Sequence, residues 1–180
     1  MSKNIKDFMQ QYIQENFQDF HFMFIRPSDL IFEENVRMNC FYCGKYGTNW
    51  RCPPHLPVLD YKKMMSEYPE GLFLWIKLKF NESNYQEIRA ESSTMLHKAL
   101  LDLEKQLWNL DSSTALSFIG GSCKLCKNGC GKEKCNNPYF SRSPLEATGC
   151  NIVKSAAKYG LDIHFPPSEG ILRLGLLLWQ

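Results

Sequence analysis

Two groups of closely spaced cysteines constrain this chain more than any other feature of its sequence. The first group is Cys40, Cys43 and Cys52, and the second is Cys123, Cys126, Cys130 and Cys135. Cysteines repeated at such short intervals in a turn-rich loop direct several sulfurs at one centre, as a soft metal ion or an iron–sulfur cluster requires. The sequence therefore predicts metal-binding loops at about residues 40–55 and 123–135.

Length and composition indicate one domain, residues 1–180, that does not need disulfides to fold. A hydrophobic content of 44% argues against disorder, and a net charge of +2 gives no reason to expect a nucleic-acid partner. The N-terminus has no secretory signal pattern, and no apolar run is long enough to cross a membrane. We expect a cytoplasmic protein, where clustered cysteines are more often ligands than disulfides.

Helical and extended patterns alternate along the chain. Apolar residues with helical spacing predict helices over residues 5–17, 56–68 and a long stretch from residue 84. A capping serine, Ser143, followed by Pro144 and Glu146, predicts a further helix over residues 143–160. Apolar stretches predict strands over residues 20–25, 72–80, 115–119 and 171–179, the last buried on both faces. This alternation predicts a single layered α/β domain with a mixed β-sheet, on which the two cysteine loops are insertions that meet at one edge.

The second cysteine loop has the spacing of a cluster ligand set. Cys123, Cys126, Cys130 and Cys135 are separated by two, three and four residues, close to the compact run of bacterial ferredoxins. This spacing favours a [4Fe–4S] cluster, whereas structural zinc sites usually pair two knuckles across a longer gap. Four lysines alternate with these cysteines and either stabilise a negative cluster, attract an acidic redox partner or simply face solvent: Lys124, Lys127, Lys132 and Lys134.

The first loop supplies only three sulfurs, so its fourth ligand is open. His55 completes a Cys₃His zinc site, while Cys135 or Cys150 completes a second four-thiolate cluster. The third alternative is a three-thiolate cluster with one open iron. Trp50 either shields the first cluster from water or is an ordinary core residue. Cys150 falls inside the predicted helix 143–160, where it is either a ligand or a buried inert thiol.

The segment from Cys43 to His55 resembles a signature of a family of bacterial and archaeal predicted metal-binding proteins, typical of anaerobes. The resemblance continues through Arg142-Ser-Pro and ends in the C-terminal apolar strand, so it covers about residues 38–180. It implies cysteine-ligated metal or iron–sulfur clusters but no established reaction. It also implies that position 150 need not be cysteine, which keeps the open-iron alternative in place.

Three functions follow from these patterns. The first is an iron–sulfur protein, with two [4Fe–4S] clusters held by the eight cysteines, that exchanges electrons with a redox protein partner. The second is an enzyme that binds substrate at an open iron of one cluster. The third is an interaction module stabilised by zinc. The sequence does not decide whether the protein is an enzyme, and the catalytic residues are unknown.

Overall fold

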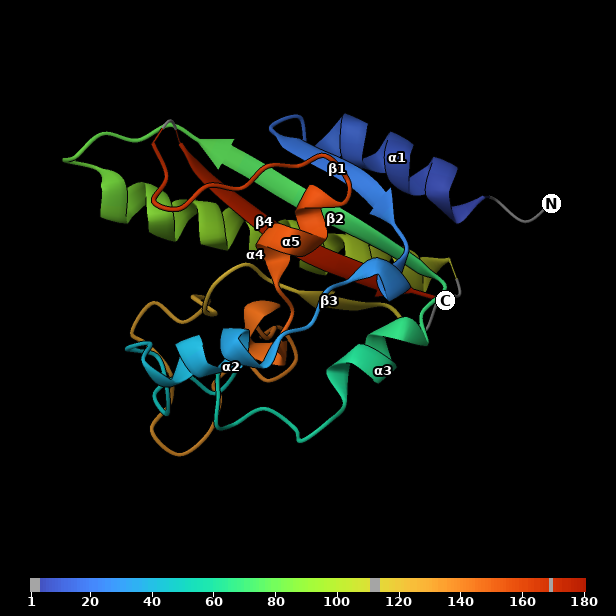
Figure 1. Cartoon of the computed structure of the whole chain (residues 1–180). Coiled ribbons are helices and arrows are strands. Elements are labelled where there is room, and N and C mark those ends of the chain that lie inside the picture. Colours follow the sequence, from blue (N-terminus) through green and yellow to red (C-terminus); the bar gives the residue numbers. More distant parts are fainter. Residues whose placement is uncertain (1–3, 111–113, 169) are drawn as a thin grey trace.

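The centre of the computed structural model is a four-stranded sheet in the order β1-β2-β4-β3 (Figure 1). The structure describes residues 4–110, 114–168 and 170–180. The strands are β1 (Phe20–Ile25), β2 (Glu70–Leu78), β3 (Leu116–Phe118) and β4 (Ile171–Trp179). The α/β class is confirmed, although all pairings between the described strands are antiparallel rather than mixed.

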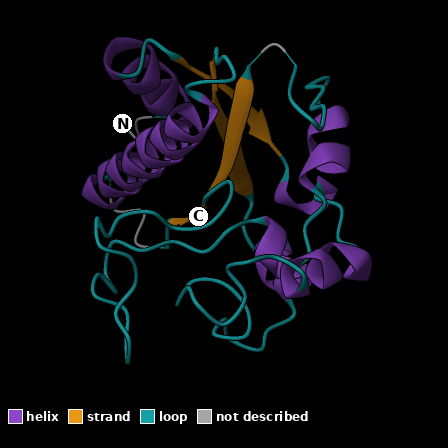
Figure 2. Cartoon of the chain, turned by 90° about the vertical axis from the view of Figure 1, so that its left-hand side faces the viewer, coloured by secondary structure: helices purple, strands orange, loops and turns teal. Residues whose placement is uncertain are grey.

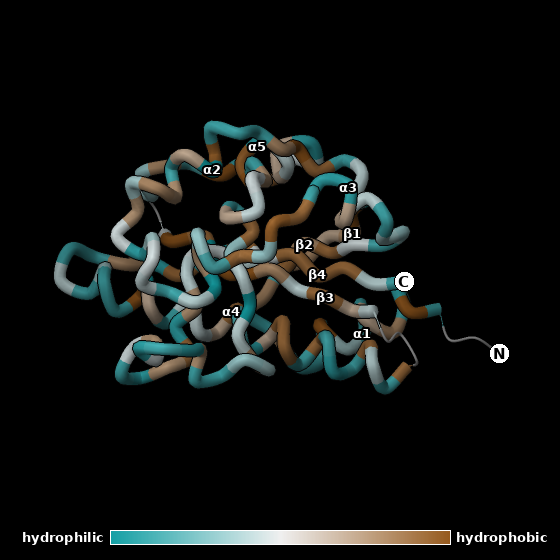
Figure 3. The backbone as a smooth tube through the Cα atoms, turned by 90° about the horizontal axis from the view of Figure 1, so that it is seen from below, coloured by the Kyte–Doolittle hydropathy of each residue, from teal (hydrophilic) through white to brown (hydrophobic). Residues whose placement is uncertain are grey.

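Helices cover both faces of this sheet, so the molecule has three layers (Figures 2 and 3). One face carries α1 (Ile5–Asn16) and α4 (Tyr85–Asn109). The other face carries three shorter helices, which are α2 (Glu34–Phe41), α3 (Tyr61–Ser66) and α5 (Ile152–Ala157). Two single turns, η1 (Pro27–Asp29) and η2 (Glu146–Thr148), complete this layer. No described helix is both long and apolar enough to cross a membrane.

The first hydrophobic cluster lies between the sheet and the pair α1 and α4. Met9 and Ile13 of α1 are buried there with four leucines of α4 that recur at helical spacing, Leu96, Leu100, Leu103 and Leu107. Gly175 of β4 makes the close approach of α4 possible, because a Cβ at this position would lie 2.6 Å from Leu100 Cδ1 and 2.8 Å from the Phe118 carbonyl oxygen. The helices predicted from residue 5 and from residue 84 are confirmed.

The second hydrophobic cluster covers the opposite face. Phe73, Leu176 and Leu178 of the central strands pack there with Leu145 and Cys150. Alternate residues of β4 thus enter different clusters, since neighbouring side chains of a strand point to opposite faces. This confirms the prediction that the C-terminal strand is buried on both sides.

The segment from residue 143 to residue 160 was predicted as one helix, and this prediction is wrong. Pro144 forms an isolated bridge with Ile119, and η2 ends at Gly149, whose φ is 92°. That left-handed conformation breaks the helical path. A new helix, α5, begins only after Asn151, whose side chain accepts a hydrogen bond from the Lys154 amide. Cys150 therefore lies between two short helices and not within a long one.

The segment before and after the first cysteine group also differs from its prediction. The helix α2, which contains Cys40 in its last turn, was not predicted at all. It buries no side chain and so lacks an amphipathic pattern. The helix predicted over residues 56–68 shrinks to α3, because Asp60 caps it by accepting from the Lys63 amide. The first cysteine loop is therefore longer than expected at its C-terminal end.

Candidate metal centre

The two cysteine loops lie side by side below the sheet in the view of Figure 1, as predicted. The buried Asn49 side chain donates from Nδ2 to the Cys123 carbonyl at 3.1 Å. Trp50 donates from Nε1 to the Gly131 carbonyl at 2.7 Å. Side chains of the first loop thus satisfy backbone carbonyls of the second, which fixes the two loops against each other.

All four cysteines of the second loop line one cavity of about 520 Å³. Four cationic side chains also line it, and no carboxylate occurs among its described lining residues: Lys45, Arg51, Lys124 and Lys127. These cations favour a bound group with net negative charge. A metal ion or cluster with four thiolate ligands carries such a charge. Burial and the neighbouring cations Arg173, Arg89 and Lys45 lower the pKa of Lys124 to about 8.

The cysteines surround this space without meeting at a point. Among the described residues, no three side chains of His, Cys, Asp or Glu are grouped closely enough to hold a single metal ion. All eight thiols are free of disulfides. A lone zinc ion draws its sulfurs to about 2.3 Å from one centre, whereas a cluster places an inorganic core between them. The thiols of the second loop therefore line a cavity rather than converge on one point.

Two polar side chains contact sulfurs of the second loop. Asn137 donates from Nδ2 to Cys126 Sγ at 3.1 Å, and Cys135 Sγ lies 3.4 Å from Ser141 Oγ. Hydrogen bonds of this kind adjust the charge on a ligating sulfur and thereby the potential of a cluster. The sequence did not single out Asn137 or Ser141, since isolated polar residues in a loop carry no pattern.

The three cysteines of the first loop differ in exposure. Cys43 is exposed, Cys40 is half-buried at the end of α2, and Cys52 is 7% exposed. Burial, followed by the nearby Cys40, Cys43 and Cys123, raises the pKa of Cys52 to about 12. Cys52 therefore lies within electrostatic reach of the other three thiols. The raised pKa favours the neutral thiol. A bound metal cation would instead lower the pKa of Cys52, because it stabilises the thiolate form.

Trp50 and His55 pair with each other through their rings. Their ring centroids are 4.4 Å apart, and His55 Nε2 lies 3.4 Å from the Gly47 carbonyl oxygen. Trp50 lines the cavity of the second loop, so any shielding that it provides applies to that cavity rather than to the first loop. The proposal of His55 as a zinc ligand stays a prediction.

Cys150 is fully buried in the second hydrophobic cluster. Its Sγ lies 3.6 Å from Ser155 Oγ, and its backbone bridges to Phe32. Burial raises its pKa to about 12. No other cysteine contributes to this shift, in contrast to Cys52, whose pKa depends on three other thiols. The surroundings of Cys150 are those of a core thiol.

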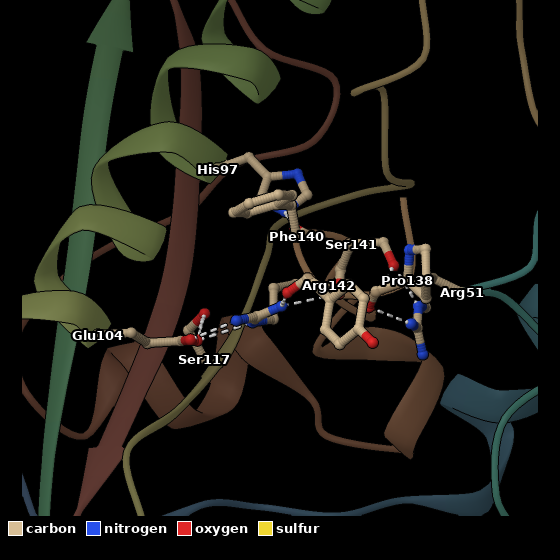
Figure 4. Close-up of polar contacts among 9 residues, drawn as sticks. Arg51, His97, Glu104, Ser117, Pro138, Phe140, Ser141 and Arg142 are labelled. Atoms are coloured by element: carbon tan, nitrogen blue, oxygen red, sulfur yellow. Dashed lines mark hydrogen bonds and ion pairs between the residues drawn. The ribbon is translucent and has the colours of Figure 1, made fainter. Parts of the chain in front are cut away.

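A buried ion pair anchors the second loop to α4 (Figure 4). Arg142 follows the loop and donates from Nε to Glu104 Oε1 at 2.8 Å, with a second bond from Nη2 to Oε2. Ser117 of β3 also donates to Glu104, and Arg142 Nη1 donates to the Tyr139 and Ser141 carbonyls. A bidentate pair with further hydrogen bonds holds both charges in place despite burial.

His97 and Arg51 add to this anchor (Figure 4). His97 Nε2 donates to the Phe140 carbonyl at 2.9 Å, and burial lowers the pKa of His97 to about 4. Arg51 of the first loop donates to Ser141 Oγ at 2.5 Å and to the Pro138 carbonyl at 2.8 Å. Residues 138–142 are thus held from α4 on one side and from the first loop on the other.

The comparison with protein families found a match. The family described as predicted metal-binding protein (DUF2284) matches residues 23–179, and the chain belongs to it. The matched segment contains both cysteine groups and Cys150. A comparison with curated proteins found no match, and a comparison with solved structures found none. This match confirms the resemblance to a family of predicted metal-binding proteins that the sequence indicated.

Proposed function

We propose that the second loop, Cys123, Cys126, Cys130 and Cys135, holds a [4Fe–4S] cluster and that the protein acts in electron transfer. The observation that carries this proposal is the cavity of about 520 Å³ that all four thiols line together with four cations. A cluster supplies a centre that gains and loses one electron. The four thiols would bind it, and Asn137 would donate a hydrogen bond to one of them, Cys126.

The first loop supports a second centre. Cys40, Cys43 and Cys52 lie within electrostatic reach of one another, and the bonds from Asn49 and Trp50 hold them beside the second loop. The exposed Cys43 would bring this centre to the surface, where a redox protein partner could exchange electrons with it. Lys45 and Lys127 would favour a partner with an acidic surface by electrostatic steering.

Metal and sulfide analysis of anaerobically purified protein tests this proposal. Two clusters give about eight irons and eight sulfides per chain, with visible absorption that bleaches on reduction. Stoichiometric zinc without sulfide would eliminate the proposal and favour the zinc-stabilised module. The matched variants are Cys126→Ala and Cys150→Ala, since each removes one thiol. We expect Cys126→Ala to lose about half of the iron and Cys150→Ala to keep all of it.

A second candidate function is an enzyme whose first-loop centre keeps one open position. Two observations favour it. Cys150 is buried among apolar side chains, and Cys135 lines the cavity of the second loop. The first loop is therefore left with three thiols of its own. The Cys150→Ala variant tests whether the first-loop centre has an open position. If it loses about four irons, Cys150 completes the first site and the open position is ruled out. If all iron stays, the open position gains support.

A further inference from the structure

A second cavity, of about 490 Å³, shares no lining residue with the cysteine cavity. It lies between the N-terminal part of α4, the first half of β4 and the segment of residues 162–168. Two arginines from different elements line it, Arg89 of α4 and Arg173 of β4. Nothing in the proposed metal chemistry uses this cavity or these arginines.

Arg173 is held in place but incompletely bonded. Its Nη2 donates to the Arg89 carbonyl at 3.3 Å, and its Nη1 lies beside Gly121. Its Nε is buried and has no hydrogen-bond partner, which is true of no other buried side-chain nitrogen or oxygen in the described part of the chain. A buried donor without an acceptor is costly, so its persistence calls for an explanation outside the chain itself.

Within the described part of the chain, neither guanidinium group has a paired acid. No described carboxylate forms an ion pair with Arg89 or Arg173 within 4.0 Å. Burial is the main reason that the pKa of Arg173 is lowered, and the neighbouring Arg89 lowers it further, while Glu146 opposes the shift. Two cations that repel each other across a cavity are stabilised when an anion lies between them.

The two described acids of the cavity are engaged elsewhere. Glu146 accepts a hydrogen bond from the Gly121 amide at 3.4 Å, and burial raises its pKa, which favours its neutral form. Asp162 lies 3.5 Å from His164 Nε2. Neither carboxylate forms an ion pair with Arg89 or Arg173, although Glu146 partly offsets the charge of Arg173.

Apart from the two arginines, the wall combines polar side chains, such as Lys77, Tyr85 and His164, with apolar ones. Ile152, Ile163, Leu172 and Leu174 line the cavity, so its interior offers hydrocarbon surface next to the two charges. Small-molecule sites commonly combine such a surface with a few convergent polar groups.

We propose that this cavity binds a small organic anion, whose carboxylate or phosphate group bridges Arg89 and Arg173 and whose short carbon body lies against the apolar side chains of the wall. The planar guanidinium fork matches both oxyanions through two parallel hydrogen bonds. The proposal is independent of the first cysteine loop. The binding itself does not depend on whether that loop holds a cluster, zinc or no metal.

Calorimetry on the protein as purified tests the proposal with three probes: butyrate, phenyl phosphate and the neutral butyramide. We expect at least one oxyanion to bind about tenfold or more tightly than butyramide, because only a charged group bonds both guanidinium groups. Comparison of butyrate with phenyl phosphate identifies the preferred head group. Failure of both oxyanions to bind, or equal binding of butyramide, overturns the proposal.

Variants of α4 separate the site from overall charge. Arg89 is exposed on the helix, so Arg89→Gln should fold normally, and Lys105→Gln removes the same charge from the same helix outside the cavity. We expect Arg89→Gln to weaken oxyanion binding about tenfold or more, Arg89→Lys to retain part of it and Lys105→Gln to leave it unchanged. Equal affinities for Arg89→Gln and Lys105→Gln contradict the proposal. Metal content measured on the same samples shows that a loss of binding is not a loss of the metal centre.

Discussion

The sheet and the cysteine loops of this protein are stabilised in different ways. The sheet is buried between two hydrophobic clusters, and its longest strands pair over their full length. The loops bury few apolar side chains and leave large ones exposed, among them Phe41, Tyr42 and Tyr139. They are held by hydrogen bonds from side chains to backbone carbonyls. Apolar burial therefore accounts for the scaffold, while polar contacts and the proposed metal account for the site.

The ion pair of Glu104 with Arg142 joins these two regions. Glu104 comes from the scaffold helix α4, and Arg142 comes from the end of the second loop. The pair is nearly removed from solvent, with side-chain exposures of 2% and 13%. Changes here should affect both regions, whereas changes elsewhere should affect one of them.

The largest effect is expected for Glu104→Leu. It leaves the Arg142 charge buried without its partner, which costs about 3–5 kcal/mol of unfolding free energy. Urea denaturation measures this loss, and metal analysis measures whether the loop still holds its centre. The double variant Glu104→Leu with Arg142→Leu is the control, since replacing both charges recovers much of the stability. A single variant as stable as the wild type would show that the pair does not anchor the loop.

A smaller effect, confined to the scaffold, is expected for Leu100→Ala. Leu100 is fully buried in the cluster between α4 and the sheet, and its truncation leaves a cavity that costs about 2–5 kcal/mol. Metal content per folded chain should stay at the wild-type value. The exposed Leu59 offers a control, Leu59→Ala, which should leave the unfolding free energy unchanged. Loss of metal from folded Leu100→Ala would contradict the separation of the two regions.

The pH dependence of stability tests His97, which bonds the loop from the scaffold. Its pKa is lowered from 6.5 to about 4, so the unfolded state binds a proton at a higher pH than the folded state does. The contribution of His97 to the free energy of unfolding is therefore fully present above pH 6.5 and decreases as the pH falls. The expected decrease between pH 7.5 and pH 5 is about 2 kcal/mol.

Urea denaturation of the wild type and of His97→Gln at both pH values isolates this contribution. Glutamine retains an N–H donor for the Phe140 carbonyl but does not titrate, so the variant should lack this part of the pH dependence. Identical pH profiles for the two proteins would show that His97 does not take up a proton on unfolding.

The smallest effect on the sheet is expected for removal of the metal. Neither hydrophobic cluster is built from the loop between residues 40 and 55, so far-UV circular dichroism should change little on chelation. The loops should become more sensitive to trypsin, which cleaves at residues such as Lys127 and Lys134. Mass spectrometry of the fragments locates the cuts. Collapse of the dichroism signal on chelation would mean that the metal also stabilises the scaffold.

The regular elements of the scaffold were largely predictable from the sequence. Leucines at helical spacing identified α4, and a continuous apolar run identified β4. Both signals come from burial, which selects residue types at fixed intervals. The antiparallel order of the strands was not predictable, because periodicity gives no information on which strands pair.

The region around Cys150 shows where sequence patterns fail. A capping serine, a proline and a glutamate favoured a helix from Ser143, but tertiary bonds pair Ser143 and Leu145 with Ile119 instead. Gly149 then turns the chain in the left-handed conformation. Local preferences of this kind are weak compared with the pairing and burial that the rest of the fold supplies.

The sequence by itself determined the number and spacing of the thiols, and with them the resemblance to a family of predicted metal-binding proteins that the family match confirms. It did so because ligand chemistry resides in residue types and short intervals. Only the tertiary structure decided that four thiols share a cavity with Lys45 and Arg51, that Cys150 is buried in the core, and that Arg89 and Arg173 face a second cavity. These features join residues distant in the chain, and their proximity depends on how the layers pack.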